Sequence, residues 1–192
     1  MKISCDFEKT FPKKKSESDL CGKACLSVIA DYFGIDSGSF EHERSVWIPD
    51  LVLDLFNNHL RTRLFCSMNS KLYADYRTAK NKAAFEGFRA VGRYEQSVGN
   101  VTMLDFGISE IDAFLANGIL LTLVDSATWN QDSMLRGGHY IVVLDSTENC
   151  YVVANPKRKE VVLQLVDKTL LSQCLAVAGG WVAVVSSETA YR

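Results

Sequence analysis

The order of the hydrophobic patterns along the chain is the feature that most restricts its fold. Segments with apolar residues at helical spacing come first, and short segments rich in β-branched residues follow. The helical segments span 20–33, 48–59, 71–88 and 107–118, and the strand-like segments span 63–68, 119–125, 139–145, 150–155, 161–166 and 181–186, with a short helix near 167–174. This order predicts an α+β fold, with N-terminal helices followed by an antiparallel sheet.

Length and composition favour one globular domain. The chain has 192 residues, of which 47% are hydrophobic and 23% charged, so a disordered chain or a coiled coil is excluded. We therefore expect a single domain over residues 1–192, with an irregular N-terminal segment over 1–17. The net charge of −2 gives no general attraction for nucleic acid or an anionic membrane. We expect a monomer with no nucleic-acid or membrane partner.

The cysteines are expected to be free thiols. The first residues, "MKISCDFEKTF", lack the apolar core of a signal peptide, and no apolar run approaches the length of a membrane span. These features predict a cytoplasmic protein, in which the six cysteines stay reduced. No cysteine or histidine pairs recur at zinc-binding spacing, so we expect neither a metal nor a cofactor.

The segment "SDLCGKACLSVIADYFG" (18–34) contains the first candidate for chemistry. Cys21 lies at the expected start of a helix, where the helix dipole and free backbone N–H groups favour a thiolate. The neighbouring Gly22 would let a substrate or another backbone approach closely. The alternative is that Cys21 is a core residue, because it also lies on the apolar stripe of this helix. Cys25, one turn later, is expected in the core.

A cysteine nucleophile needs a base, and His139 has the most suitable setting of the three histidines. It opens the apolar segment "HYIVVLD" directly after Gly137 and Gly138, so a strand can anchor it while its ring faces a cleft. The alternative is an ordinary histidine at a strand end. His42 and His59 lie in polar surroundings and are expected at the surface.

Asn155 is the candidate that would orient this base. It ends the segment "CYVVAN", and the turn-forming "DSTEN" separates that segment from the strand of His139. A hairpin centred near residue 147 would place Asn155 opposite His139. The asparagine oxygen could then accept a hydrogen bond from His139 Nδ1–H, as in a Cys–His–Asn arrangement.

Two tryptophans lie near these candidates. Trp129 belongs to the polar segment 126–138 that leads to His139, which predicts a loop at one rim of the cleft and a side chain that contacts substrate. Trp47 precedes the expected helix 48–59 and is expected to be a packing residue.

Several segments together resemble a known family. "CGKACLSVIADYFG", "SVWIPDLVLDLF", "SEIDAFLANGILLTLVD", "GGHYIVVLD" and "ANP" resemble, in order from residue 19 to residue 185, the guanylyl-cyclase-domain-containing family of eukaryotic proteins. That family is related to the bacteriocin-processing cysteine peptidases. The resemblance implies a papain-like fold, in which Cys21 is the nucleophile, His139 the base and Asn155 the orienting residue, acting on a peptide or protein substrate.

The chain departs from the bacteriocin-processing relatives at two places. Leu20 precedes the cysteine where those relatives have aspartate, and Asp19 stands one residue earlier. Those relatives also carry a glutamine about six residues before the cysteine, whose amide stabilises the oxyanion, and the corresponding place here is near Lys15. Lys15, Ser18 and, next to the proposed base, Gly138 are therefore the further candidates for contacts with substrate.

The sequence is compatible with three functions. The first is a cysteine-dependent hydrolase of peptide, isopeptide or amide bonds. The second is a guanylate cyclase that converts GTP to cyclic GMP, which the family name implies, although the chain contains no P-loop and its acidic residues are scattered. The third is a catalytically inactive papain-like binding module.

Overall fold

The computed structural model describes residues 21–40, 47–67, 82–132, 134, 138–157, 160–177 and 180–187. The helices are α2 (Cys21–Phe33), the 3-10 helix η1 (Ser37–Ser39), α3 (Ile48–Asn57), α5 (Lys82–Ser97), α6 (Ile108–Leu115), α7 (Ser126–Asn130) and α8 (Lys168–Val177). The strands are β1 (Leu60–Ser67), β2 (Thr102–Leu104), β3 (Ile119–Asp125), β4 (Gly138–Ser146), β5 (Cys150–Lys157), β6 (Glu160–Asp167) and β7 (Trp181–Ser187). The expected α+β class is confirmed.

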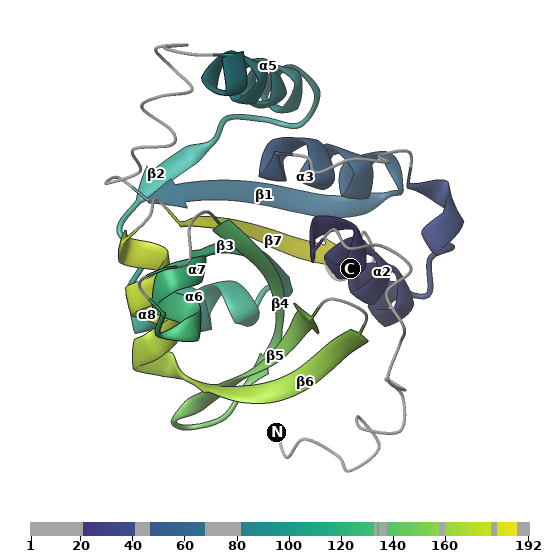
Figure 1. The fold of residues 1–192 in the computed structure, drawn as a ribbon. Helices are drawn as coiled ribbons and strands as arrows, with labels where there is room; N and C mark the ends of the chain where they lie inside the picture. The colour runs from purple at the N-terminus through teal and green to yellow at the C-terminus, as the bar shows by residue number, and fades with distance from the viewer. Residues whose placement is uncertain are drawn as a thin grey trace.

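Seven strands form one sheet in the order β2-β1-β7-β3-β4-β5-β6 (Figure 1). Every neighbouring pair is antiparallel except β1 and β2, which are parallel. The prediction of a purely antiparallel sheet is therefore wrong at this edge. The reason is that β2 has only three residues, of which two are exposed, so it leaves no strand pattern in the sequence.

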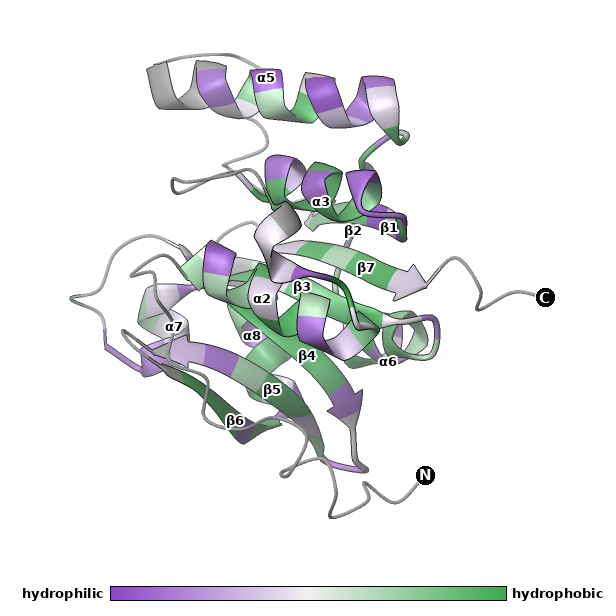
Figure 2. Cartoon of the chain, turned by 90° about the vertical axis from the view of Figure 1, so that its right-hand side faces the viewer, coloured by the Kyte–Doolittle hydropathy of each residue, from purple (hydrophilic) through white to green (hydrophobic). Residues whose placement is uncertain are grey.

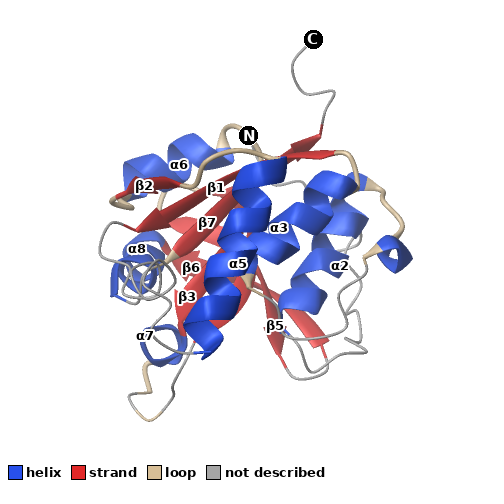
Figure 3. Cartoon of the chain, turned by 90° about the horizontal axis from the view of Figure 1, so that it is seen from above, coloured by secondary structure: helices blue, strands red, loops and turns tan. Residues whose placement is uncertain are grey.

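Helices cover both faces of the sheet, as Figure 3 shows from above. Helices α2 and α3 pack on one face, and α6, α7 and α8 pack on the other, where β3 to β6 curl around them (Figure 1). Two clusters of buried side chains result, one on each face. Figure 2 shows the hydrophobic residues concentrated in the central strands β3, β4 and β7, while α5 is largely hydrophilic.

Helix α2 follows the pattern that predicts it. Its apolar stripe, which includes Cys25, Val28 and Ile29, is buried against the sheet. It ends at Gly34, whose φ of +69° is the left-handed conformation that glycine adopts without strain. Both the helix and its glycine end were predicted. Ser18 and Asp19, the expected caps, lie outside the described residues.

Helix α5 differs most from its prediction. The expected helix spans 71–88, whereas the structure has a helix over Lys82–Ser97, and residues 71–81 lie outside the described part. Burial of Ala90, Val91 and Tyr94 extends the helix past the two glycines in its sequence. Arg93 then binds the buried carboxylate of Asp50 on α3 at 2.6 Å. Tertiary contacts of this kind outweigh weak local propensity.

The N-cap of helix α6 lies two residues before the expected cap, Ser109. Its N-cap is Gly107, and the Glu110 carboxylate accepts a hydrogen bond from the Gly107 N–H at 3.0 Å. Ser109 instead donates to the same carboxylate. Across the described residues, no helix is long and apolar enough to cross a membrane.

Candidate active site

Cys21 is the first residue of α2, as the sequence predicts. Its position depends on close packing at Gly22, which is buried between α3 and β4. A Cβ at Gly22 would lie 3.1 Å from Leu51 Cδ1 and 3.3 Å from Tyr140 Cδ2. The side of Gly22 that lacks a side chain therefore faces the core and not a substrate, and it brings the start of α2 against β4.

His139 and Asn155 lie on the neighbouring strands β4 and β5. Their side chains are joined by a hydrogen bond of 2.7 Å between His139 Nε2 and Asn155 Oδ1. Asn155 is buried, with 3% of its surface exposed, while His139 is half-buried. The sequence-predicted pairing of this histidine with this amide is therefore present.

The strand register that joins them differs from the prediction. Val142 pairs with Ala154, so continuing this register places Asn155 opposite Ile141 and not opposite His139. The shift is two residues, and a shift of an even number keeps every side chain on its face of the sheet. His139 and Asn155 are consequently diagonal neighbours on one face, within reach of each other.

The shift comes from a later turn, and a β-bulge reduces it. Ser146 pairs with Tyr151, so the turn is centred between residues 148 and 149 and would by itself shift the register by three residues. The register changes between Val143 and Asp145, where β4 has one extra residue relative to β5. This extra residue brings the shift back to two, which keeps the two candidate side chains on one face of the sheet. The sequence around "DSTEN" predicts a turn but contains no residue that marks the bulge.

The ring nitrogen that binds Asn155 is also different from the predicted one. Asn155 Oδ1 contacts Nε2, whereas the sequence analysis assigned this contact to Nδ1. Because Oδ1 can only accept, Nε2 carries the proton of the neutral ring. The unprotonated nitrogen is then Nδ1, which leaves it as the atom that can take a proton from Cys21.

The environment of Cys21 favours its thiolate. Burial alone would raise the pKa of the Cys21 thiol. A hydrogen bond from the His139 side chain, the positive charge of that ring and backbone hydrogen bonds at Tyr140 and Gly22 act in the opposite direction and prevail. The pKa of Cys21 therefore lies below its ordinary value of 9.0.

Two of the other described cysteines have the opposite character, because their pKa values are raised. Cys25 is fully buried, and burial together with the nearby Cys21 charge raises its pKa well above 9.0, as expected for a core residue. Burial and the Asp125 charge raise the pKa of Cys174 to about 11. Cys66 is buried and Cys150 half-buried, and all five described cysteines are free thiols.

Trp129 lies beside the proposed base. Its ring centroid is 6.5 Å from that of His139, with an interplanar angle of 43°. The expected loop over 126–138 is wrong at its start, because residues Ser126–Asn130 form α7, whose first turn is capped by the Asp125 carboxylate. Trp129 is only 9% exposed and belongs to the core cluster on the α6–α8 face, so it supports His139 from beside the ring.

The remaining sequence-predicted residues fall into three groups. At Gly138, a Cβ would lie 2.5 Å from Leu123 Cδ1, so strand packing explains this glycine. Lys15, Ser18 and His42 lie outside the described residues. His59 is exposed, as predicted, and Trp47 packs half-buried against the core cluster on the α2 face.

Two further groups in the site were not predicted from the sequence. Gln164 on β6 accepts a hydrogen bond from Asn155 Nδ2 through its Oε1 at 3.4 Å. Gln164 is the single polar residue of the apolar run "VVLQLV", and this signal could have identified it. The backbone of Tyr140, which helps to stabilise the Cys21 thiolate, leaves no signal in the sequence.

No cluster of three metal-binding side chains occurs among the residues that the structure describes. In comparisons with known proteins, no protein-family model matches this chain and no curated protein matches it.

Proposed function

We propose that this protein is a cysteine-dependent hydrolase that cleaves peptide, isopeptide or amide bonds. The observation that carries the proposal is the chain of contacts from Cys21 to His139 to Asn155, with 2.7 Å between the last two side chains. A nucleophile in contact with a base, and a base oriented by a third group, is the arrangement that covalent catalysis requires. Helices followed by a sheet, with the cysteine at a helix start, also fit a papain-like fold.

The first half of the reaction forms an acyl-enzyme. The Cys21 thiolate attacks the carbonyl carbon, so a C–S bond forms and the carbonyl electron pair moves onto oxygen. The His139 imidazolium then gives its proton to the leaving nitrogen, and the C–N bond breaks. The products of this half are a free amine and a thioester on Cys21.

The second half releases the acyl group. Neutral His139 takes a proton from water while the water oxygen attacks the thioester carbon. The C–S bond breaks, a carboxylic acid leaves, and the thiolate–imidazolium pair is restored. Asn155 keeps the ring of His139 in one orientation through both halves, because its oxygen holds the Nε2 proton.

The backbone N–H of Cys21 supports the developing oxyanion. This N–H belongs to the first turn of α2, where backbone donors have no partner within the helix. The upstream glutamine found in the bacteriocin-processing peptidases has no counterpart in this chain. Loss of one oxyanion donor lowers turnover by about 10²–10³-fold, so we expect slow catalysis.

Digestion of a complex peptide mixture tests the proposal. We expect wild-type protein to generate new amine and carboxyl termini, detected by mass spectrometry, with and without EDTA. Cys21→Ala and His139→Ala should generate none, and the half-buried Cys150→Ala is the matched control that should retain turnover. Cleavage that persists in Cys21→Ala, or that a chelator abolishes, would contradict a thiol mechanism.

A further inference from the structure

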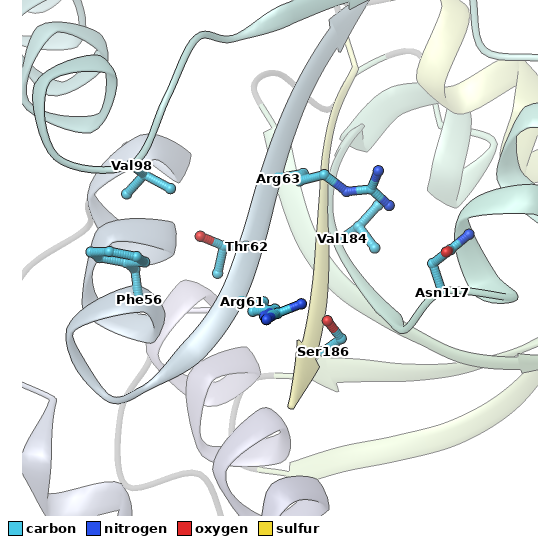
Figure 4. A pocket seen from close by; sticks show the side chains of 8 residues that line it. All are labelled: Phe56, Arg61, Thr62, Arg63, Val98, Asn117, Val184 and Ser186. Carbon is cyan, nitrogen blue, oxygen red and sulfur yellow. The ribbon is translucent and has the colours of Figure 1, made fainter. Parts of the chain in front are cut away.

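A second candidate site lies at the opposite end of the sheet from Cys21. A pocket of about 400 Å³ is formed where the first half of β1 meets β7, and Figure 4 shows its lining side chains. Ile119, at the start of β3, pairs with Val185 beside this pocket, whereas Val124, near the end of β3, pairs with His139. The two places are therefore about 17 Å apart along one strand.

Two arginines give the pocket its charge. Arg61 and Arg63 are two residues apart on β1, so their side chains leave the same face of the strand. In Figure 4 both lie on the side of β1 that also holds Ser186 and Asn117. Neither guanidinium has a carboxylate partner in the described part of the chain, and Arg63 lies over the Phe65 ring at 5.9 Å.

The other side of the pocket is apolar. Phe56 and Val98 lie across β1 from the arginines, close to Thr62 (Figure 4). Thr62 is 7% exposed, and its Oγ1 has no hydrogen-bond partner among the described residues. This oxygen is itself buried, so it lies beneath the pocket surface and a ligand does not reach it.

We propose that this pocket binds a small organic anion, a phosphate or carboxylate attached to an apolar group. The two guanidinium groups bind the anion through charge-assisted hydrogen bonds, and the Ser186 hydroxyl adds a further donor. Phe56 and Val98 contact the apolar group. The volume suits a small molecule, and none of the eight described lining residues is acidic. The site is independent of the Cys21 chemistry.

Titration of the wild-type chain followed by amide chemical shifts in NMR tests this site. The probes are phenyl phosphate, phenylacetate and, as the neutral analogue, benzyl alcohol. We expect saturable shifts at Thr62 and Arg63 with at least one of the two anions, and affinity at least about tenfold weaker for benzyl alcohol. The anion that binds more tightly distinguishes a phosphate ligand from a carboxylate ligand.

Variants connect the binding to the named side chains. The double variant Arg61→Gln/Arg63→Gln should weaken binding of the preferred anion at least about tenfold. Arg89→Gln removes the same charge from the exposed face of α5 and should leave the affinity within about twofold. Saturable shifts with neither anion, or equal affinity in the double variant and the wild type, would overturn the proposal.

Discussion

The orientation of His139 depends on a short series of amide contacts. Asn155 uses its oxygen for His139 Nε2 and its nitrogen for Gln164 Oε1, so both ends of one buried amide have a partner. If the amide turned over, an NH2 group would face the protonated ring nitrogen. The contact with Gln164 opposes that rotation, so Gln164 is a positioning residue of the proposed triad.

The first prediction concerns the charge next to the base. Asn155→Asp places a carboxylate at the hydrogen-bond distance of 2.7 Å from His139 Nε2. An adjacent negative charge favours the charged ring, so the pKa of His139 should rise relative to wild type, and activity should stay within about tenfold. NMR titration of the His139 ring measures the pKa. An unchanged pKa in this variant would remove Asn155 from the triad.

Substitution of Gln164 tests the second contact. Gln164→Leu removes the acceptor of the Asn155 amide but keeps an apolar side chain of similar size, so the Cys21 alkylation rate should fall about three- to tenfold with a shifted pH profile. Gln164→Glu retains an acceptor and should restore most of the rate. Gln96→Leu, at an exposed position of α5, is the control. Equal rates in all three variants would show that Gln164 is only a packing residue.

At the scale of elements, the packing of α7 against the sheet connects stability with the site. Trp129 is the buried residue of this five-residue helix, and it contacts both the core cluster and the His139 ring. Such a short helix has little stability of its own, so the tryptophan holds it in place. The polar residues around Trp129 in the sequence predict an exposed side chain. The structure shows instead that this side chain is buried.

The third prediction follows from this burial. Trp129→Ala should lower the free energy of unfolding by about 3–5 kcal/mol, since a large buried aromatic side chain leaves a cavity. Urea denaturation measures this loss, and Trp129→Phe should recover part of it. The Cys21 alkylation rate should also fall, more in Trp129→Ala than in Trp129→Phe, because the His139 ring loses its neighbour. Stability equal to wild type in Trp129→Ala would mean that the side chain is exposed in solution.

Elements with strong local patterns were predictable, and elements that depend on distant contacts were not. Helix α2 and strand β4 have regular apolar spacing, so both were located within a residue or two. Strand β2 and the extension of α5 to Ser97 depend on neighbours from other parts of the chain. The β4–β5 register was wrong by two residues because neither the exact centre of the turn, between residues 148 and 149, nor the bulge that follows it is marked in the sequence.

At the scale of the whole molecule, the site is a product of tertiary structure. Cys21, His139 and Asn155 come from α2, β4 and β5, and the residue types with their positions at element ends were enough to select them from the sequence. The choice of ring nitrogen and the support from Trp129 could not be predicted, because each depends on three-dimensional distances. The lowered pKa of Cys21 exists only when these elements are assembled.

The pH dependence of Cys21 alkylation tests the central claim most directly. The folded chain is treated with limiting iodoacetamide at a series of pH values, and the labelled peptides are then mapped by mass spectrometry. At pH 6, about three units below the ordinary thiol pKa of 9.0, we expect Cys21 to react ahead of the other cysteines. In His139→Ala, burial of Cys21 is no longer opposed by the ring, so its pKa should rise and its alkylation should require higher pH.

Unfolding supplies the control within the same experiment. In urea the contacts between α2 and β4 are lost, so Cys21 should react at the rate of an ordinary thiol and its advantage at pH 6 should disappear. The account predicts fast alkylation of Cys21 that requires both the fold and His139. Cys21 reacting no faster than Cys150 in the folded wild type, or equally fast in His139→Ala, would contradict it.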